Sequence, residues 1–300
     1  MRIIAGLAAA GYNHAVSGAE RLQRVQALVL RVEPLGERDR LVKLFSAQRG
    51  SIAARATSAL ELNSRLAPRL MPPHLGSFML VSGRSGLPIV AGAEIASRFS
   101  HWRSSGDRVV LCSLLLAVLD DLRAPPETNA QFWQLAVNLL RNQPVDRSLV
   151  SLLALFLHRS LELLGLAGDA RCALCDRLLA PPQYSVRSRT YALAAADFST
   201  FICRRCFNRK YGSQQVDATK VQVSDLALLA RLRRCPLLDY PKLALRPRQA
   251  AFVLELFRRR AQDMLPETVA MLAGVAAHLE VPAFALPASH GASLAPDGYN

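Results

Sequence analysis

Two pairs of cysteines have the spacing that binds a metal ion. Cys172 and Cys175 are separated by two residues, and the pair Cys203 and Cys206 follows after 27 intervening residues. Two residues between thiols let both sulfurs reach one metal from a tight turn, and four thiolates suit a tetrahedral Zn²⁺ ion. The gap is longer than the roughly 15 to 20 residues usual in zinc ribbons, but the loop needs only to return to the metal. The cysteines therefore predict one zinc site.

Four thiolates fill the coordination sphere of zinc and leave no position for a reacting water, so the predicted Zn²⁺ is structural. An iron-sulfur cluster uses the same ligands and stays open as an alternative. Because the site is absent from an unfolded chain, removal of the metal should loosen the surrounding lobe. The other two cysteines, Cys112 and Cys235, lie in apolar helical sequence and are predicted to be small core residues.

Cationic side chains surround the cysteines, and aromatic residues are scattered among them. Cations suit phosphate and aromatic rings suit bases, so this region is predicted to contact nucleic acid. A second basic set lies in the N-terminal third, where single-strand binding by a barrel is expected. The candidate contacts are Arg187, Arg189, Arg204, Arg205, Arg209 and Lys210 near the cysteines, and Arg31, Lys43, Arg55, Arg65 and Arg69 in the N-terminal third.

Enzyme signatures are absent from the sequence, which contains no Gly-rich phosphate loop with a lysine, no nucleophile elbow and no deaminase-type zinc motif. Asp120, Asp121 and Glu127 form the nearest approach to a carboxylate cluster, but they are expected to be a solvated helix boundary beside Pro125 and Pro126. A metal-dependent nuclease is kept as a minor alternative. We expect a protein that is not an enzyme.

Length and composition support several folded units and a polyanionic partner. The 300 residues are 51% hydrophobic, enough to bury real cores, and 37 basic against 23 acidic side chains give a net charge of +14. An anionic membrane surface competes with nucleic acid as a partner, but no helix has a concentrated basic face. No apolar run approaches the roughly 20 residues of a membrane span. The N-terminus resembles a weak signal peptide, yet thiols spaced for metal favour a reducing, cytoplasmic (nucleoid-associated) location.

The first hundred residues alternate between short apolar runs and turn residues. Five strands in about 75 residues are typical of an OB-type barrel. From Asp107 onward the apolar period becomes that of helices, which predicts a central three-helix unit before the cysteines and further helices after them. Strands are expected at 24–32, 40–45, 50–57, 75–82 and 89–94, and helices at 107–122, 127–141, 148–166, 224–234, 248–265 and 267–280.

These elements predict an α+β multidomain chain with an N-terminal OB-fold β-barrel, a central helical bundle, an inserted four-cysteine zinc lobe and C-terminal helices. The expected boundaries are 1–22 for an N-terminal extension, 23–100 for the barrel, 101–169 for the helical domain, 170–212 for the zinc lobe, 213–281 for the C-terminal helices of the helical domain, and 282–300 for a flexible tail.

Several stretches between Gln23 and Tyr211 resemble the bacterial recombination mediator family RecO. They occur in the order of that family's landmarks: Ala27-Leu-Val-Leu30, Gly36-Glu-Arg-Asp-Arg-Leu-Val-Lys-Leu-Phe-Ser46, Gly50-Ser-Ile52, Leu70-Met-Pro-Pro73, Ala93-Glu94, and Leu161-Glu-Leu-Leu-Gly-Leu166 leading into Cys172-Ala-Leu-Cys175. The chain departs from the family at Arg55-Ala-Thr57, where a Lys-Gly pair is usual, and in the longer gap between cysteine pairs.

The resemblance implies binding without bond-making. It implies contact with single-stranded and double-stranded DNA, annealing of complementary strands, and work with RecR that lets RecA displace single-strand-binding protein. It also implies that the four cysteines hold the metal and that Arg55, Arg65 and Arg69 lie near DNA. The alternative from another class is a zinc-ribbon regulator that binds RNA or a transcription complex.

Overall fold

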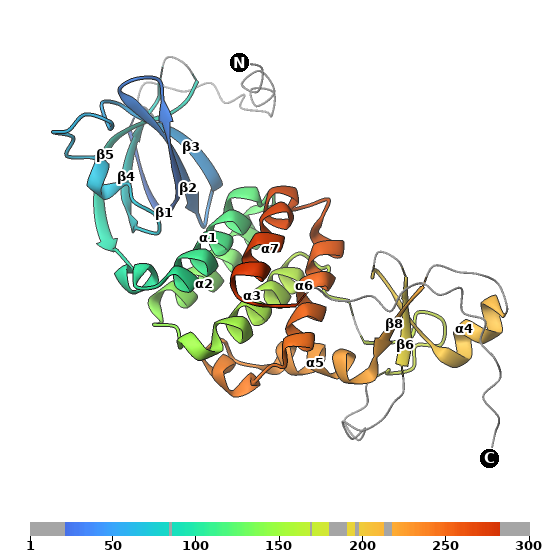
Figure 1. The fold of residues 1–300 in the computed structure, drawn as a ribbon. Helices are drawn as coiled ribbons and strands as arrows, with labels where there is room; N and C mark the ends of the chain where they lie inside the picture. The colour runs from blue at the N-terminus through green and yellow to red at the C-terminus, as the bar shows by residue number, and fades with distance from the viewer. Residues whose placement is uncertain are drawn as a thin grey trace. The chain divides into compact units, whose positions relative to one another are not determined.

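The structure, a computed structural model, describes residues 22–83, 86–168, 170–179, 191–195, 198–212 and 218–282 (Figure 1). The contacts group the chain into two compact units. The first holds the described residues up to Leu44 and Ala53–Ser97, and the second holds Phe45–Ile52 and the described residues from Arg98 onward. The predicted N-terminal extension lies outside the described residues except for Leu22, which begins the first strand, and so does all of the predicted tail except Pro282.

The first unit is built on five strands that close into a barrel, as the alternating pattern predicts. They are β1 (Leu22–Leu35), β2 (Asp39–Ser46), β3 (Gly50–Ala56), β4 (Leu75–Val81) and β5 (Ile89–Ser97), in the order β1-β2-β3-β5-β4. Strands β1 and β4 are antiparallel, and β3 meets β5 in parallel. This order closes the sheet without a free edge, and the predicted OB-type barrel is confirmed.

The interior of the barrel explains its local sequence. Val42, Leu44 and Phe78 are fully buried, and the residue before each of them in its strand is more exposed. In β1 the whole run Ala27–Leu30 is buried. Gly76 is required where β4 meets β5, because a Cβ there would lie 2.3 Å from the backbone oxygen of Glu94. The buried residues therefore decide which face of each strand points into the barrel, and Gly76 allows β4 and β5 to approach closely.

The second unit is mainly helical, and its long helices match the predicted ranges to within a few residues. They are α1 (Gly106–Asp121), α2 (Pro126–Arg141), α3 (Leu149–Leu163), α5 (Val223–Arg234), α6 (Pro247–Ala261) and α7 (Pro266–His278). Helix α3 is buried on nearly every side because it contacts α1, α2, α5 and α6, while α7 packs on α1 and α6. Figure 1 shows α6 and α7 returning to α3 and α1 from far along the chain.

One sequence interpretation about polar residues in this unit needs correction. Asp120 and Asp121 are not a solvated boundary. Asp120 is buried and accepts a hydrogen bond from the Ser51 hydroxyl at 3.3 Å, and Asp121 accepts one from the Thr268 backbone N–H at 2.9 Å, in the first turn of α7. The carboxylates therefore serve packing and helix capping.

His158 is a buried residue of α3, and both of its ring nitrogens are buried without a hydrogen-bond partner. Glu162 lies nearest, with Oε1 3.9 Å from Nε2. Burial lowers the pKa of His158 to about 4, although Glu162 acts to raise it. The imidazole is therefore neutral in the folded protein at pH 7.

We expect the free energy of unfolding to fall as the pH drops from about 6.5 toward 4. Over this range the unfolded chain binds a proton at His158, whereas the folded protein does not. The loss at pH 5 should be about 2 kcal/mol. Urea unfolding of the native chain and of His158→Leu at pH 7 and pH 5 measures it. His158→Leu should lose most of this pH dependence, while His278→Gln, at a half-exposed site beside Asp107, should keep it.

The third group of elements forms a lobe around the cysteines, within the second unit. It comprises β6 (Tyr191–Ala195), β7 (Phe201–Cys203), α4 (Arg204–Tyr211) and β8 (Ala218–Gln222), with β6 at the centre of a three-stranded sheet. We call residues 170–179, 191–195, 198–212 and 218–222 the cysteine lobe. Its sheet includes β8, which lies in the segment that the sequence pattern had placed with the C-terminal helices.

Candidate metal centre and nucleic-acid interface

The cysteine lobe brings its two cysteine pairs together through the strand β7. Cys172 forms an isolated bridge with Phe201, and the Ala173 N–H donates to the Phe201 carbonyl at 2.9 Å. Cys203 ends β7, and Cys206 lies in the first turn of α4. The tight turn that holds each cysteine pair is called a knuckle here. The knuckle of Cys172 and Cys175 is thus held against β7, the strand that leads into the second knuckle, which holds Cys203 and Cys206.

The four sulfur atoms form a set that fits one metal ion. All of them lie within 4.8 Å of one another, and the sulfurs of Cys175 and Cys203 are 4.0 Å apart. A tetrahedral ion with metal-sulfur bonds of about 2.3 Å needs sulfurs about 3.8 Å apart. This is the only group of three or more potential metal ligands among the described residues. The cysteines can therefore bind a metal with little rearrangement, and four sulfur ligands leave it a structural role.

Backbone groups favour the thiolate that such a metal requires. The Cys203 N–H donates to the Cys172 sulfur at 3.3 Å, and the Cys206 N–H donates to the Cys203 sulfur at 3.4 Å. Burial opposes ionisation of Cys172, but the N–H groups of Cys203, Leu174 and Cys175 outweigh it and lower its pKa to about 6. The sulfurs of Cys203 and Cys175 raise the pKa of Cys206 to about 12. A bound metal cation would favour the deprotonated form of both Cys172 and Cys206, because metals bind thiolates.

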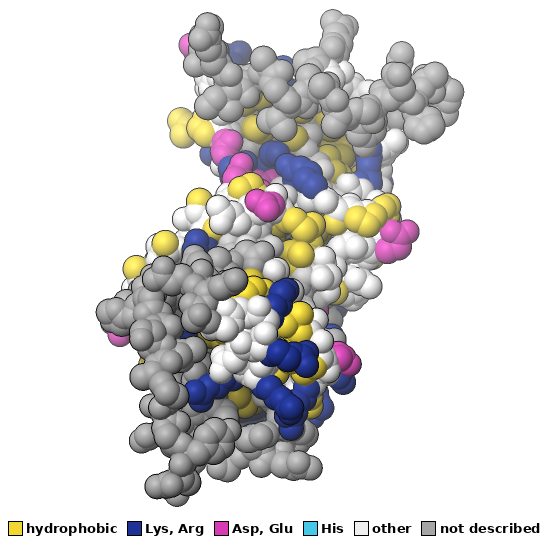
Figure 2. Space-filling view, turned by 90° about the vertical axis from the view of Figure 1, so that its right-hand side faces the viewer, with side chains coloured by type: hydrophobic (Ala, Val, Ile, Leu, Met, Phe, Trp, Pro, Cys, Tyr) yellow, Lys and Arg dark blue, Asp and Glu magenta, His cyan; other side chains and the backbone are white. Residues whose placement is uncertain are grey.

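Helix α4 presents cations on the surface that adjoins the cysteines. Arg204, Arg205, Arg209 and Lys210 are exposed, while Cys206 and Phe207 are buried. The helix contains no acidic residue. The Lys210 ammonium lies 5.1 Å from the centre of the Tyr211 ring, which itself packs on Phe207. Figure 2 views the molecule from the side on which α4 lies in Figure 1 and shows Lys and Arg side chains gathered there with few acidic ones.

Arg260 fastens the cysteine lobe to the helices, a role that the sequence pattern did not indicate. From α6, its guanidinium donates to the carbonyls of Phe198 at 2.7 Å and Leu166 at 2.8 Å, and also to that of Ala167. It also lies 5.3 Å from the centre of the Phe201 ring. Gly168 makes room for it, because a Cβ there would come within 2.6 Å of the guanidinium. One side chain of α6 thus contacts both the segment that leads into the lobe, at Leu166 and Ala167, and the lobe itself, at Phe198.

We expect Arg260→Ala to lower the free energy of unfolding by on the order of 3 kcal/mol, since partly buried carbonyls lose a charged donor. Arg260→Lys should recover little, because an ammonium cannot span carbonyls as a planar guanidinium does. Denaturant unfolding and hydrogen exchange at β7 measure the effect. Arg258→Ala is the control, because Arg258 pairs with Glu255 on its own helix; an equal loss in both variants would contradict a special role for Arg260.

Comparison with known proteins identifies the chain. The family model "Recombination protein O N terminal" matches residues 21–99, which hold the five-stranded barrel. A DNA repair protein RecO from Nocardioides sp. is 34% identical over 163 residues, covering 53% of this chain and 66% of that protein, just under two thirds of its length. The chain belongs to the RecO family.

Two further RecO relatives extend the similarity beyond the barrel. The DNA repair protein RecO of Desulforamulus reducens is 25% identical over 181 residues, covering 60% of this chain and 70% of the relative. That of Listeria innocua is 22% identical over 219 residues, covering 73% of this chain and 82% of the relative. The match of 219 residues is too long to be confined to the barrel, so the RecO similarity includes part of the helical unit.

The barrel cations of this RecO-family chain are held to different degrees. Arg55 pairs with Asp39, whose pKa is lowered by the Ser58 N–H and by Arg55 itself, and Arg69 donates to the Ala93 carbonyl at 2.7 Å. Arg31 pairs with Glu33 at 3.1 Å. Lys43 is half-buried and Arg65 is exposed. Contact of these side chains with DNA stays a prediction, and the candidates Arg187 and Arg189 lie outside the described residues.

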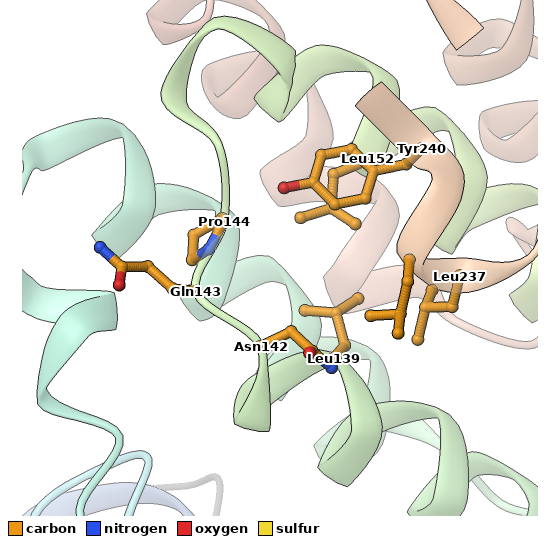
Figure 3. Close-up of a pocket in the computed structure, with 8 residues that line it drawn as sticks. Leu139, Asn142, Gln143, Pro144, Leu152, Leu237 and Tyr240 are labelled. Atoms are coloured by element: carbon orange, nitrogen blue, oxygen red, sulfur yellow. The ribbon is translucent and has the colours of Figure 1, made fainter. Parts of the chain in front are cut away.

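One pocket in the helical unit is too small to hold a substrate. Figure 3 shows Leu139, Leu152, Leu237 and Tyr240 lining a small pocket in the helical unit. Its volume of about 10 Å³ holds about one water molecule. The Tyr240 hydroxyl accepts from the Val145 N–H at 2.6 Å, so the tyrosine fixes a loop. Among the described helices, none is both long and apolar enough to cross a bilayer.

Proposed function

We propose that this RecO-family protein binds single-stranded and double-stranded DNA, anneals complementary strands, and with RecR helps RecA load onto DNA coated with single-strand-binding protein. The observation that carries the proposal is the exposed cation set of α4, free of acidic residues and built directly onto the four-cysteine cluster. Phosphate contacts from such a surface neutralise two strands and leave their bases available for pairing.

Within this proposal the four cysteines hold Zn²⁺. The ion supplies no reaction chemistry, because the sulfur set leaves it no open position. Its contribution is to fix the knuckle of Cys172 and Cys175 against β7, and so to fix the start of α4. The side chains of α4 then bind phosphate from a rigid helix, which keeps the entropy cost of binding low.

The protein acts by binding, without cutting or joining DNA. The described residues contain no carboxylate cluster that could hold a catalytic metal, and the acidic pair at the end of α1 is occupied in packing. Labelled DNA incubated with the protein and magnesium or manganese should stay intact. Cleavage that purifies with the protein would support a nuclease instead.

The deciding experiment is annealing of complementary DNA strands coated with single-strand-binding protein, with and without RecR. We expect the protein to accelerate annealing of coated strands, and RecR to redirect it toward RecA loading. A zinc-ribbon regulator would bind nucleic acid without accelerating annealing. Tighter binding to RNA than to DNA, with no annealing, would favour that second class and overturn the proposal.

A further inference from the structure

A second and larger cavity lies in the helical unit, away from the cysteines. It has a volume of about 500 Å³, within the range of small-molecule sites. Its lining comes from the N-terminal end of α3, the segment that enters α6 and the C-terminal end of α7. No step of the proposed strand annealing uses it, and none of its lining residues belongs to the cysteine lobe.

One end of the cavity gathers hydrogen-bond donors that have no partner. Ser148 and Ser151 line it and are only 9% and 6% exposed. Within the part of the chain that the structure describes, neither hydroxyl makes a hydrogen bond. Ser148 occupies the N-cap position of α3, but its hydroxyl does not bond to the helix backbone. The two residues are largely buried, but their oxygens are not among the fully buried polar atoms that lack a partner. Both hydroxyls are therefore accessible from the cavity and free to bond to a group that enters it.

The charge at the same end is positive. The 15-residue helix α3 begins at Leu149 and points its N-terminal end at the cavity, where the helix dipole favours an anion. Arg147 also lines the cavity and has no ion pair among the described residues. Pro247, the first residue of α6, also lines the cavity. The Leu149 N–H already donates to the Asp146 carbonyl, so the donors available here are side chains. Two hydroxyls and a guanidinium offer more donors than the two oxygens of a carboxylate accept, and they suit a tetrahedral phosphate.

The remaining walls are apolar, with one acidic residue. Val150, Leu245 and Leu279 supply hydrophobic surface large enough for an organic group beside the phosphate. Glu280 lies at the α7 end of the lining, where it repels an anion and can accept hydrogen bonds from a sugar or an amino group. This polarity places the phosphate at α3 and the organic group toward α7.

We propose that this cavity binds a terminal phosphate monoester carried on an apolar or planar body. A nucleoside monophosphate and the phosphorylated 5′ end of a DNA strand share that chemistry. The inference stands apart from the proposed annealing activity, because it depends on residues 147–151 and not on α4 or the cysteines.

The test measures binding of dAMP, deoxyadenosine and inorganic phosphate to the full chain by calorimetry. In parallel, the affinity of a 5′-phosphorylated oligonucleotide is compared with that of its 5′-hydroxyl form. We expect dAMP or the phosphorylated end to bind at least tenfold tighter than the form without phosphate. Binding of dAMP identifies a free nucleotide as the ligand, and a preference confined to the oligonucleotide identifies a strand end.

Ser151→Ala and Arg147→Gln should each remove most of this preference, while Arg141→Gln, an exposed change at the end of α2, should keep it. Ser151→Ala should fold normally because it removes an unpaired hydroxyl, and its thermal unfolding without ligand checks this. The proposal is overturned if the phosphate adds no affinity in either comparison, or if both cavity variants keep the native preference.

Discussion

Replacement of Cys172 by serine is expected to release the bound metal and to unfold the cysteine lobe while the barrel stays folded. Cys172 joins the metal set and also pairs with Phe201 beside β7, so its loss removes a ligand and loosens the entry to the second knuckle. Structural zinc contributes about 10 to 16 kcal/mol to the folding of zinc-finger peptides, which exceeds what this small sheet can supply alone. Metal analysis of the purified protein and hydrogen exchange in β6 and β7 measure the two effects.

The matched control is Cys235→Ser. Cys235 is a buried cysteine outside the set, and its thiol donates to the Pro236 carbonyl, which a hydroxyl can also do. This variant should retain one metal ion per chain. Treatment of the native protein with a chelator should reproduce the hydrogen exchange of Cys172→Ser. A full metal content in Cys172→Ser would contradict the four-cysteine site.

The second large effect is expected from charge reversal on α4. Arg205 and Arg209 lie one turn apart and are both exposed, so Arg205→Glu/Arg209→Glu reverses one face of the helix without touching the buried Cys206 and Phe207. If each arginine neutralises one phosphate, the slope of log K against log salt for single-stranded DNA should fall by about 1.4 in magnitude. Affinity at 0.15 M salt should fall by more than tenfold, and annealing should slow with it.

Arg98→Glu/Arg141→Glu is the control, because it changes the net charge equally at exposed positions outside the cysteine lobe. Titrations at several salt concentrations separate a local contact from the general field of a protein with net charge +14. Equal losses of slope in both variants would remove α4 from the binding surface and leave the barrel cations, Arg65 first among them, as the alternative contact.

The barrel and the long helices could be predicted from the sequence because their signals are local. Alternation of buried and exposed residues along β2, and the apolar stripe of α2, are each contained in one stretch of chain. The cysteine set was equally accessible, since two CxxC pairs need no knowledge of the fold. Its long gap has a physical reason: the intervening segment contains β6, the central strand of the lobe's sheet.

What the sequence did not reveal depends on contacts between distant segments. Strand β6 reads Tyr-Ala-Leu-Ala-Ala, and alanine favours helix, so only pairing with β7 and β8 makes it a strand. The arginines at the end of α6 have the pattern of a solvated face, yet Arg260 contacts carbonyls more than 60 residues away along the chain. The unpaired nitrogens of His158 likewise follow from helices that surround α3, which no periodicity indicates.

The position of β8 bears on how this protein can be dissected. The strand completes the sheet from the far side of α4 and continues without a linker into α5, which starts at Val223. Deletion of 170–212 would remove β6, the strand with which β8 pairs. The backbone N–H and C=O groups of β8 would then be unpaired and would favour aggregation. We therefore expect the protein without the cysteine lobe to stay monomeric and folded only when the deletion also removes Ala218–Gln222.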